Sequence, residues 1–349
     1  MENSYQRFKN LLLDPRFFAL LLVIAVGALL VAFFRNPLLP FLLALVLAYF
    51  LDGVVKQVMA WKDHRGLAVA ITYSLFLVFY LVGIFGPLQL AVRQAVQLVR
   101  SLPRFAGRLQ ELSNVFVEYL TELIPLEQHE QVAGLFAENV KAWGEALLLT
   151  SIAGIGQATT WAINLLLIPL LVFFLLKDKL ALQRAFVRLL PRERELVERV
   201  WREMEGKLAN YVRGKVWEIL IVGTVSSLAF ILLGFGYAAM MGLVTGFSVV
   251  VPFVGAIGTA LPLFVLGYLQ WGPGWDLGWL MIVYTVIQLL DGNLLAPLIL
   301  SEAVKLHPIF ILLAVFVFGS LWGFWGVFFA IPLATLAKSV LDAFFSLSD

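Results

Sequence analysis

Long runs of apolar residues with hardly any charge are the feature that most limits how this chain can fold. About 20 consecutive apolar residues span a hydrocarbon core of roughly 30 Å, and the chain contains several runs of about that length. Apolar residues make up 61% of the 349 residues and charged residues only 14%, against about 45–50% and about 25% in soluble domains. A soluble fold could not bury so much apolar surface, so we expect a membrane protein.

Six of these runs predict single membrane-spanning helices, and two longer stretches predict interrupted ones. The single spans are 17–34, 38–55, 67–85, 152–176, 216–233 and 277–300, and the interrupted stretches are 238–270 and 306–345. Each interrupted stretch contains several Gly and Pro residues, which break helices. Backbone groups freed within a membrane must be satisfied by protein or by a water-filled cavity. We therefore expect each of the two stretches to form a hairpin of two short helices.

The expected fold class is all-α: a polytopic transmembrane helical bundle of about eight spans, some broken or re-entrant. A helical extracytoplasmic insert and an amphipathic cytoplasmic arm complete it, because apolar residues recur there every three or four positions. The expected segments are N-terminal transmembrane helices (1–86), the insert (87–151), a transmembrane helix (152–176), the arm (177–215) and a C-terminal transmembrane region with both hairpins (216–349).

Basic residues set the expected orientation. Segment 177–215 carries eleven Lys and Arg residues and six acidic ones, whereas the segment between the third and fourth spans carries five basic and seven acidic residues. Because basic loops stay on the cytoplasmic side, the first segment is predicted to be cytoplasmic and the second to lie outside. Both termini are then cytoplasmic if each hairpin returns to its own side. Tyr268, Trp271, Trp275 and Trp279 are expected to form an aromatic belt at the outer interface.

Signatures of enzymes are absent from the sequence. There is no cysteine, and the three histidines stand alone, so we expect neither a metal site nor another cofactor. No GxSxG or GxxxxGK[ST] motif occurs, which argues against a serine hydrolase and a P-loop ATPase. The expected partners are the lipid bilayer, a small-molecule or ion substrate and further copies of this chain in a homo-oligomer, with no nucleic acid.

A polar group inside the run 277–300 is the sharpest candidate for a functional site. It consists of Gln288, Asp291 and Asn293. A carboxylate in a membrane span costs about 2.5–3.5 kcal/mol at mid-bilayer, so it usually faces a cavity, a partner or a substrate. The alternative is that residues 291–293 only break the helix near the cytoplasmic interface.

Further polar or flexible positions have a structural alternative beside the functional one. Arg213 and Glu218 are candidates for a gate, although a salt bridge of Glu218 with Arg213 or Lys215 at a helix end is the favoured interpretation. His307 could titrate near neutral pH or cap a helix. The pairs Gly242/Gly246 and Gly319/Gly323 fit close helix packing, but each lies in a broken stretch, where transporters bind their substrates.

Several motifs in the C-terminal half resemble the AI-2E (autoinducer-2 exporter-like) family, also called UPF0118 or PerM-like permeases. They are residues 251–255 (VPFVG), the run Asp291…Pro297…Leu306-His307-Pro308, the glycines at 319, 323 and 326 before Ile331-Pro332, and residues 211–214 (YVRG). The family usually has Gln where this chain has Lys215. The resemblance implies a transporter in the cytoplasmic (inner) membrane of a prokaryote, and the activities attributed to the family include export of autoinducer-2 and sodium(lithium)/proton antiport.

The expected function is therefore secondary transport, with export of a small molecule coupled to an ion gradient. One alternative is a sodium(lithium)/proton antiporter in which Asp291 titrates, and another is a membrane scaffold that transports nothing. The candidate residues for substrate or ion binding are Asp291, Asn293, Gln288, Pro252, Gly255, Gly258, Gly319, Gly323 and His307, and those for gating are Arg213 and Glu218.

Overall fold

The computed structural model describes residues 35–61, 64–101, 158–189, 195–252, 254–300 and 307–346. Every regular element within these ranges is a helix, which confirms the all-α fold class. The first expected span, residues 17–34, lies outside the described residues, as does most of the expected insert.

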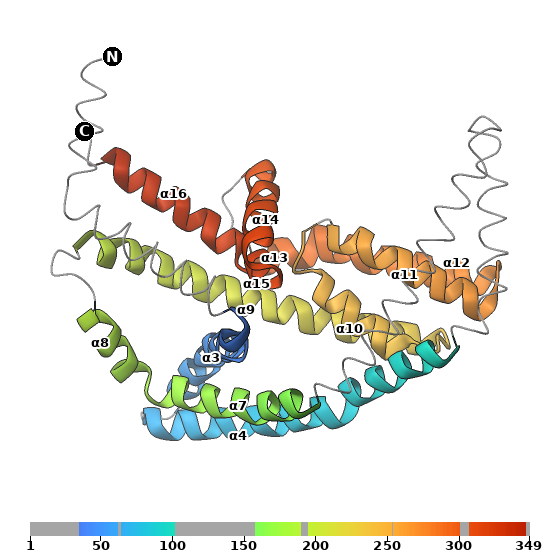
Figure 1. Cartoon of the computed structure of the whole chain (residues 1–349), viewed down its shortest axis with the longest axis horizontal. Helices are drawn as coiled ribbons and strands as arrows, with labels where there is room; N and C mark the ends of the chain where they lie inside the picture. Colours follow the sequence, from blue (N-terminus) through green and yellow to red (C-terminus); the bar gives the residue numbers. More distant parts are fainter. Residues whose placement is uncertain are drawn as a thin grey trace, which may run out of the picture.

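The helices follow the apolar runs of the sequence, because a backbone in lipid must satisfy its own hydrogen bonds. They are α3 (Arg35–Met59), α4 (Arg65–Gly83), the π-turn η1 (Ile84–Leu88), α7 (Ala158–Lys177), α8 (Lys179–Leu189), α9 (Glu195–Leu232), α10 (Ala238–Ser248), α11 (Val254–Trp271), α12 (Trp275–Leu290), the π-turn η3 (Asp291–Leu295), α13 (Ala296–Leu300), α14 (Pro308–Trp322), α15 (Phe324–Phe328) and α16 (Ala330–Ser346). Figure 1 shows their arrangement.

Five helical stretches in the described part of the chain are long and apolar enough to cross a membrane. They are Leu39–Met59, Arg65–Ser101, Met204–Leu232, Val254–Trp271 and Trp275–Ile299. The chain is accordingly a multi-pass membrane protein, while the expected number of about eight spans is not confirmed.

Two helices run past the boundaries expected from the apolar runs. The helix that begins at Arg65 continues through Pro87, which sits in the π-turn η1, to Ser101. A π-turn accommodates a residue that cannot donate an α-helical hydrogen bond. Helix α9 has 38 residues and joins the expected arm to the expected fifth span without a break. At 1.5 Å per residue both stretches reach about 55 Å, so part of each projects beyond a core of roughly 30 Å.

Helices α3, α4 and α7 form one packed group around small and aliphatic side chains such as Ala44, Ala68 and Val172. Pro169 lies inside α7 and has no N–H, so it leaves the carbonyl of Leu165 without its helical donor. The Tyr80 hydroxyl of α4 donates to that carbonyl at 3.0 Å. The contact between the helices therefore supplies the hydrogen-bond donor that the proline lacks.

Helix α10 packs against the C-terminal half of α9 at very short range (Figure 1). A Cβ at Gly246 would lie 2.7 Å from the Cα of Gly223, and a Cβ at Gly242 would collide with Ser227. Only glycine fits at such backbone contacts. The Gly242/Gly246 pair is thus used for helix packing.

The second broken stretch consists of α14, α15 and α16, so it contains a third short helix that the sequence did not predict. Its first break falls at Gly323, which adopts a φ of +60° and ends α14. This left-handed conformation is open to glycine at little cost. Of the residues expected to form an aromatic belt, Trp275 and Trp279 are exposed, whereas Tyr268 is buried against Leu277.

Candidate functional site

The first broken stretch has its turn between the end of α10 and the start of α11. Helix α10 ends at Ser248, and α11 begins at Val254 after a turn that contains Pro252. Gly255 approaches the carbonyl of Ser248 so closely that a Cβ would collide with it, and its N–H donates to the carbonyl of Val251 at 2.9 Å. The carbonyls of Phe247, Ser248 and the C-cap residue Val249 lie at this turn, and the first two accept from the N–H groups of Val250 and Val251.

Lys215 of α9 satisfies one of these carbonyls. Its Nζ donates to the carbonyl oxygen of Val249 at 2.8 Å and to Glu218 Oε2 at 2.8 Å. Both charged side chains are only 3% exposed. An ammonium at a helix C-terminus also interacts favourably with the helix dipole. Glu218 is therefore paired with Lys215, one of the two partners considered from the sequence.

Tyr211 makes the corresponding contact to the second broken stretch. Its buried hydroxyl donates to the carbonyl of Phe328, the last residue of α15, at 2.8 Å. Because Tyr211 and Lys215 are four residues apart, they lie on the same face of α9. One stripe of α9 thus holds a freed carbonyl from each broken stretch. The two stretches also meet there, as Val250 packs with Phe328 and Tyr211.

Asp291 lies in the π-turn η3, which packs against the same helix α9. Its side chain is 9% exposed, and its Oδ1 has no hydrogen-bond partner among the described residues. The charges of Glu218 and Lys215 both act on it. The Lys215 ammonium is bonded to Glu218, so the Asp291 carboxylate is a second buried acidic group near a single ion pair. Asp291 lies about 24 Å along the helix from Trp275 at 1.5 Å per residue, within the apolar stretch Trp275–Ile299.

A chain of hydrogen bonds leads from Gln288 of α12 to α11. Gln288 Nε2 donates to the Tyr284 hydroxyl at 3.1 Å, and that hydroxyl donates to the carbonyl of Ala256. The Thr259 hydroxyl lies 2.6 Å from the Tyr284 hydroxyl. Residues 284, 288 and 291 follow a spacing of four and three, so they share one face of the helix. Asp291 therefore lies on the same helix face as a polar network that reaches the first turns of α11.

The remaining candidate residues are not all at this site. Asn293 is exposed and donates to the carbonyl of Leu289 on its own helix at 2.9 Å. His307 is exposed and caps α14, because its Nδ1 accepts from the N–H of Ile309 at 3.4 Å. Gly258 is exposed, with nothing near its Cα.

Three further candidates occupy structural positions. Gly319 and Gly323 lie at the joint between α14 and α15, where a Cβ at Gly319 would be 2.9 Å from the side chain of Val327. Arg213 lies against Gly53 of α3, and a Cβ there would be 2.8 Å from its Nε. Arg213 is therefore directed away from Glu218, whose bond goes to Lys215.

Thr259 and Tyr284 were not singled out from the sequence, and Tyr211 was noted only as part of the motif at residues 211–214. Lys215 was considered only as a partner of Glu218, and its bond to Val249 was not expected. The spacing of three between Lys215 and Glu218, within an otherwise apolar segment, is the signal that could have identified the pair as buried. The contacts of the tyrosines join segments far apart in the chain, and no local pattern reveals them.

The fold and the site together define a multi-pass helical membrane protein with charged groups buried among broken helices, which is typical of transporters. Comparison with known proteins agrees with this class. The model of the AI-2E transporter family matches residues 18–346, so the chain belongs to that family.

Several relatives match over nearly their whole length. The chain is 39% identical over 347 residues to the permease PerM of Escherichia coli (strain K12), covering 98% of this chain and 97% of PerM. It is 27% identical to the transport protein YueF of Bacillus subtilis (strain 168), covering 88% and 84%. It is 24% identical to the AI-2 transport protein TqsA of E. coli (strain K12), covering 89% and 87%. The chain is accordingly a transporter of the permease type and not an enzyme.

Proposed function

We propose that this permease is a secondary transporter that exports a small molecule and couples the export to an ion gradient at Asp291. The observation that carries the proposal is the buried Oδ1 of Asp291, which has no hydrogen-bond partner among the described residues. It lies on a turn that packs against α9, the helix of the Lys215–Glu218 pair. With all three groups ionised, the site carries one negative charge in excess. A buried unpaired charge is costly, so the site favours a proton or a small cation that neutralises it.

The position of the site supports a role in moving the broken helices. Lys215 donates to the carbonyl of Val249 after the end of α10, and it also interacts electrostatically with Asp291. When Asp291 is neutral, Lys215 loses one of its two attracting carboxylates. The contact that holds the end of α10 then changes in strength, and this couples ion binding to the first broken stretch. On the same face of the helix, Gln288 donates to Tyr284, whose hydroxyl donates to α11.

The substrate class is proposed from a relative. TqsA is named as an AI-2 transport protein, and we propose a small polar molecule of that kind for this chain, with Gln288, Tyr284 and the backbone around Pro252–Gly258 as hydrogen-bonding groups. A sodium(lithium)/proton antiporter is the second candidate. It is favoured by the same excess carboxylate, since Asp291 could carry a cation in one direction and a proton in the other.

The wider assignments belong to the same proposal. The chain resides in the cytoplasmic (inner) membrane with both termini in the cytoplasm, and it assembles as a homo-oligomer. The basic surplus of segment 177–215 supports this orientation. The many exposed apolar side chains along Arg65–Ser101 support contacts with lipid and with neighbouring copies.

Reconstituted protein tests the proposal. Proteoliposomes with an imposed pH gradient are assayed for transport of autoinducer-2, and vesicles loaded with a pH-sensitive dye are challenged with NaCl or LiCl for antiport. Asp291→Asn keeps the shape of the side chain and removes its charge. We expect it to reduce gradient-driven flux at least tenfold while the protein remains folded.

Asp276→Asn is the matched control, since Asp276 is an exposed carboxylate at the other end of the same helix. It is expected to stay within twofold of the wild type. Wild-type flux with unchanged pH dependence in Asp291→Asn would show that Asp291 is only a polar residue in a π-turn. If the wild type moves neither probe, with or without a gradient, the scaffold alternative is favoured.

A further inference from the structure

Helix α8 follows directly on the apolar helix α7, which ends at Lys177, and it turns away from the direction of α7 (Figure 1). Its first residue, Lys179, donates to Asp52 Oδ2 of α3 at 2.9 Å. Nearby, Arg65 at the start of α4 donates to the carbonyl of Leu176 at 3.3 Å. The ends of α3, α4 and α7 are thus tied together at the level where α8 begins.

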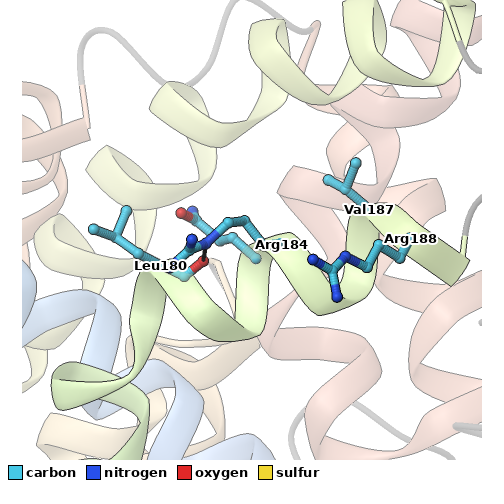
Figure 2. A pocket seen from close by; sticks show the side chains of 5 residues that line it. Leu180, Arg184, Val187 and Arg188 are labelled. Carbon is cyan, nitrogen blue, oxygen red and sulfur yellow. Dashed lines mark hydrogen bonds between the residues drawn. The ribbon is translucent and has the colours of Figure 1, made fainter.

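One side of α8 lines an open hollow of about 580 Å³ (Figure 2). The lining consists of Leu180, Gln183, Arg184, Val187 and Arg188. Arg184 and Arg188 are exposed and four residues apart, so their guanidinium groups project from the same face of the helix. Leu180 and Val187 add aliphatic surface to that face. Paired guanidinium groups beside aliphatic side chains match a ligand that carries both a phosphate and a hydrocarbon part.

Basic residues outnumber acidic ones in the described part of the chain around α8 and the adjoining helix ends. The described basic residues at the ends of α3, α4 and α7 and along α8 are Lys56, Arg65, Lys177, Lys179, Arg184 and Arg188, whereas the acidic ones are Asp52 and Asp178. Asp178 lies between α7 and α8, and Asp52 is paired with Lys179 and Lys56. The outer half of α8 therefore presents positive charge. Clusters of Lys and Arg directly next to a membrane helix attract anionic lipids, with about 1 kcal/mol per residue near the surface.

We propose that α8 lies along the membrane surface and binds the headgroup of an anionic phospholipid. Arg184 and Arg188 hold the phosphodiester, and Leu180 and Val187 contact the upper part of an acyl chain. A bound lipid would fix the direction of α8 and, through the Lys179–Asp52 bond, the ends of α3 and α7. This surface is separate from the buried site on α9 and does not depend on the proposed transport activity.

Native mass spectrometry of the delipidated full-length protein tests this inference. Phosphatidylglycerol and phosphatidylcholine are added in parallel, because both contain a phosphate but only the first has a net charge. The test variant is Arg184→Gln/Arg188→Gln. The control is Arg93→Gln/Arg100→Gln, which removes the same charge from exposed positions near the other end of the helix that begins at Arg65.

We expect the wild type and the control to retain phosphatidylglycerol in preference to phosphatidylcholine. The test variant should bind at least fivefold less phosphatidylglycerol than the wild type. Unchanged retention in the test variant, an equal loss in the control or equal binding of both lipids would each overturn the proposal. Thermal stability is measured in the same samples with inorganic phosphate. Stabilisation by phosphate as large as by phosphatidylglycerol would mean that the site binds free phosphate and not a lipid.

Discussion

Replacement of Lys215 by Met tests whether the buried ion pair holds the first broken stretch. The substitution keeps most of the side-chain volume and removes the ammonium group. It leaves Glu218, which is 3% exposed, without its partner and the Val249 carbonyl without a donor. Removing one partner of a buried ion pair costs about 3–5 kcal/mol, so we expect a loss of that size in the free energy of unfolding, measured by denaturation in mixed micelles.

The same variant gives two further readouts. Glu218 can relieve part of the cost by taking up a proton, so the loss should be smaller at pH 5 than at pH 8, because the folded variant then binds more protons than the unfolded one. Adding Glu218→Gln to Lys215→Met should restore much of the stability. Lys207→Met, at an exposed position of the same helix, is the control and should stay within about 0.5 kcal/mol. A loss in Lys215→Met no larger than in Lys207→Met, or no recovery in the double variant, would refute the reasoning.

Three further outcomes are expected. Tyr211→Phe leaves the Phe328 carbonyl without its donor and should lower the free energy of unfolding by about 1–3 kcal/mol, whereas an unchanged value would mean that water replaces the hydroxyl. Gly246→Ala should lower the free energy of unfolding strongly because of the backbone contact with α9. Gly258→Ala, in open space, should leave it unchanged or raise it by up to about 1 kcal/mol, and equal effects of the two substitutions would contradict this packing. Single cysteines at Arg100 and Ala185 of this cysteine-free chain should react with a membrane-impermeant reagent from opposite sides, and reaction of both from the same side would overturn the orientation.

The sequence predicted most of the membrane helices because lipid leaves few alternatives for a long apolar run. The cores of α3, α4, α7 and α12 fall within the expected spans, and the Gly and Pro residues correctly indicated that two stretches are interrupted. Helix ends were harder to predict. The junction near residue 215 lacks a strong helix breaker, so the apolar and amphipathic parts of α9 form one helix.

Only part of the candidate site could be found in the same way. Asp291 was identified because a carboxylate in an apolar run is costly. Its place in a π-turn was not predicted, since residues 291–293 equally suggest a broken helix. The donors from Tyr211 and Lys215 to carbonyls 117 and 34 residues away depend on how the helices pack. For His307 the sequence left titration and helix capping open, and the structure shows a helix cap.

The arrangement on α9 explains why two interruptions can be stable in the same membrane region. Each break frees carbonyl groups that would cost free energy in hydrocarbon, and α9 supplies one donor to each from residues a single turn apart. The two donors differ in kind. The Tyr211 hydroxyl is neutral, so its bond to Phe328 has a fixed strength. The Lys215 ammonium donates to both Val249 and Glu218, and it also interacts electrostatically with Asp291. On the proposed mechanism, the second broken stretch is therefore the static attachment to α9, and the first is the one whose attachment responds when Asp291 gains or loses a cation.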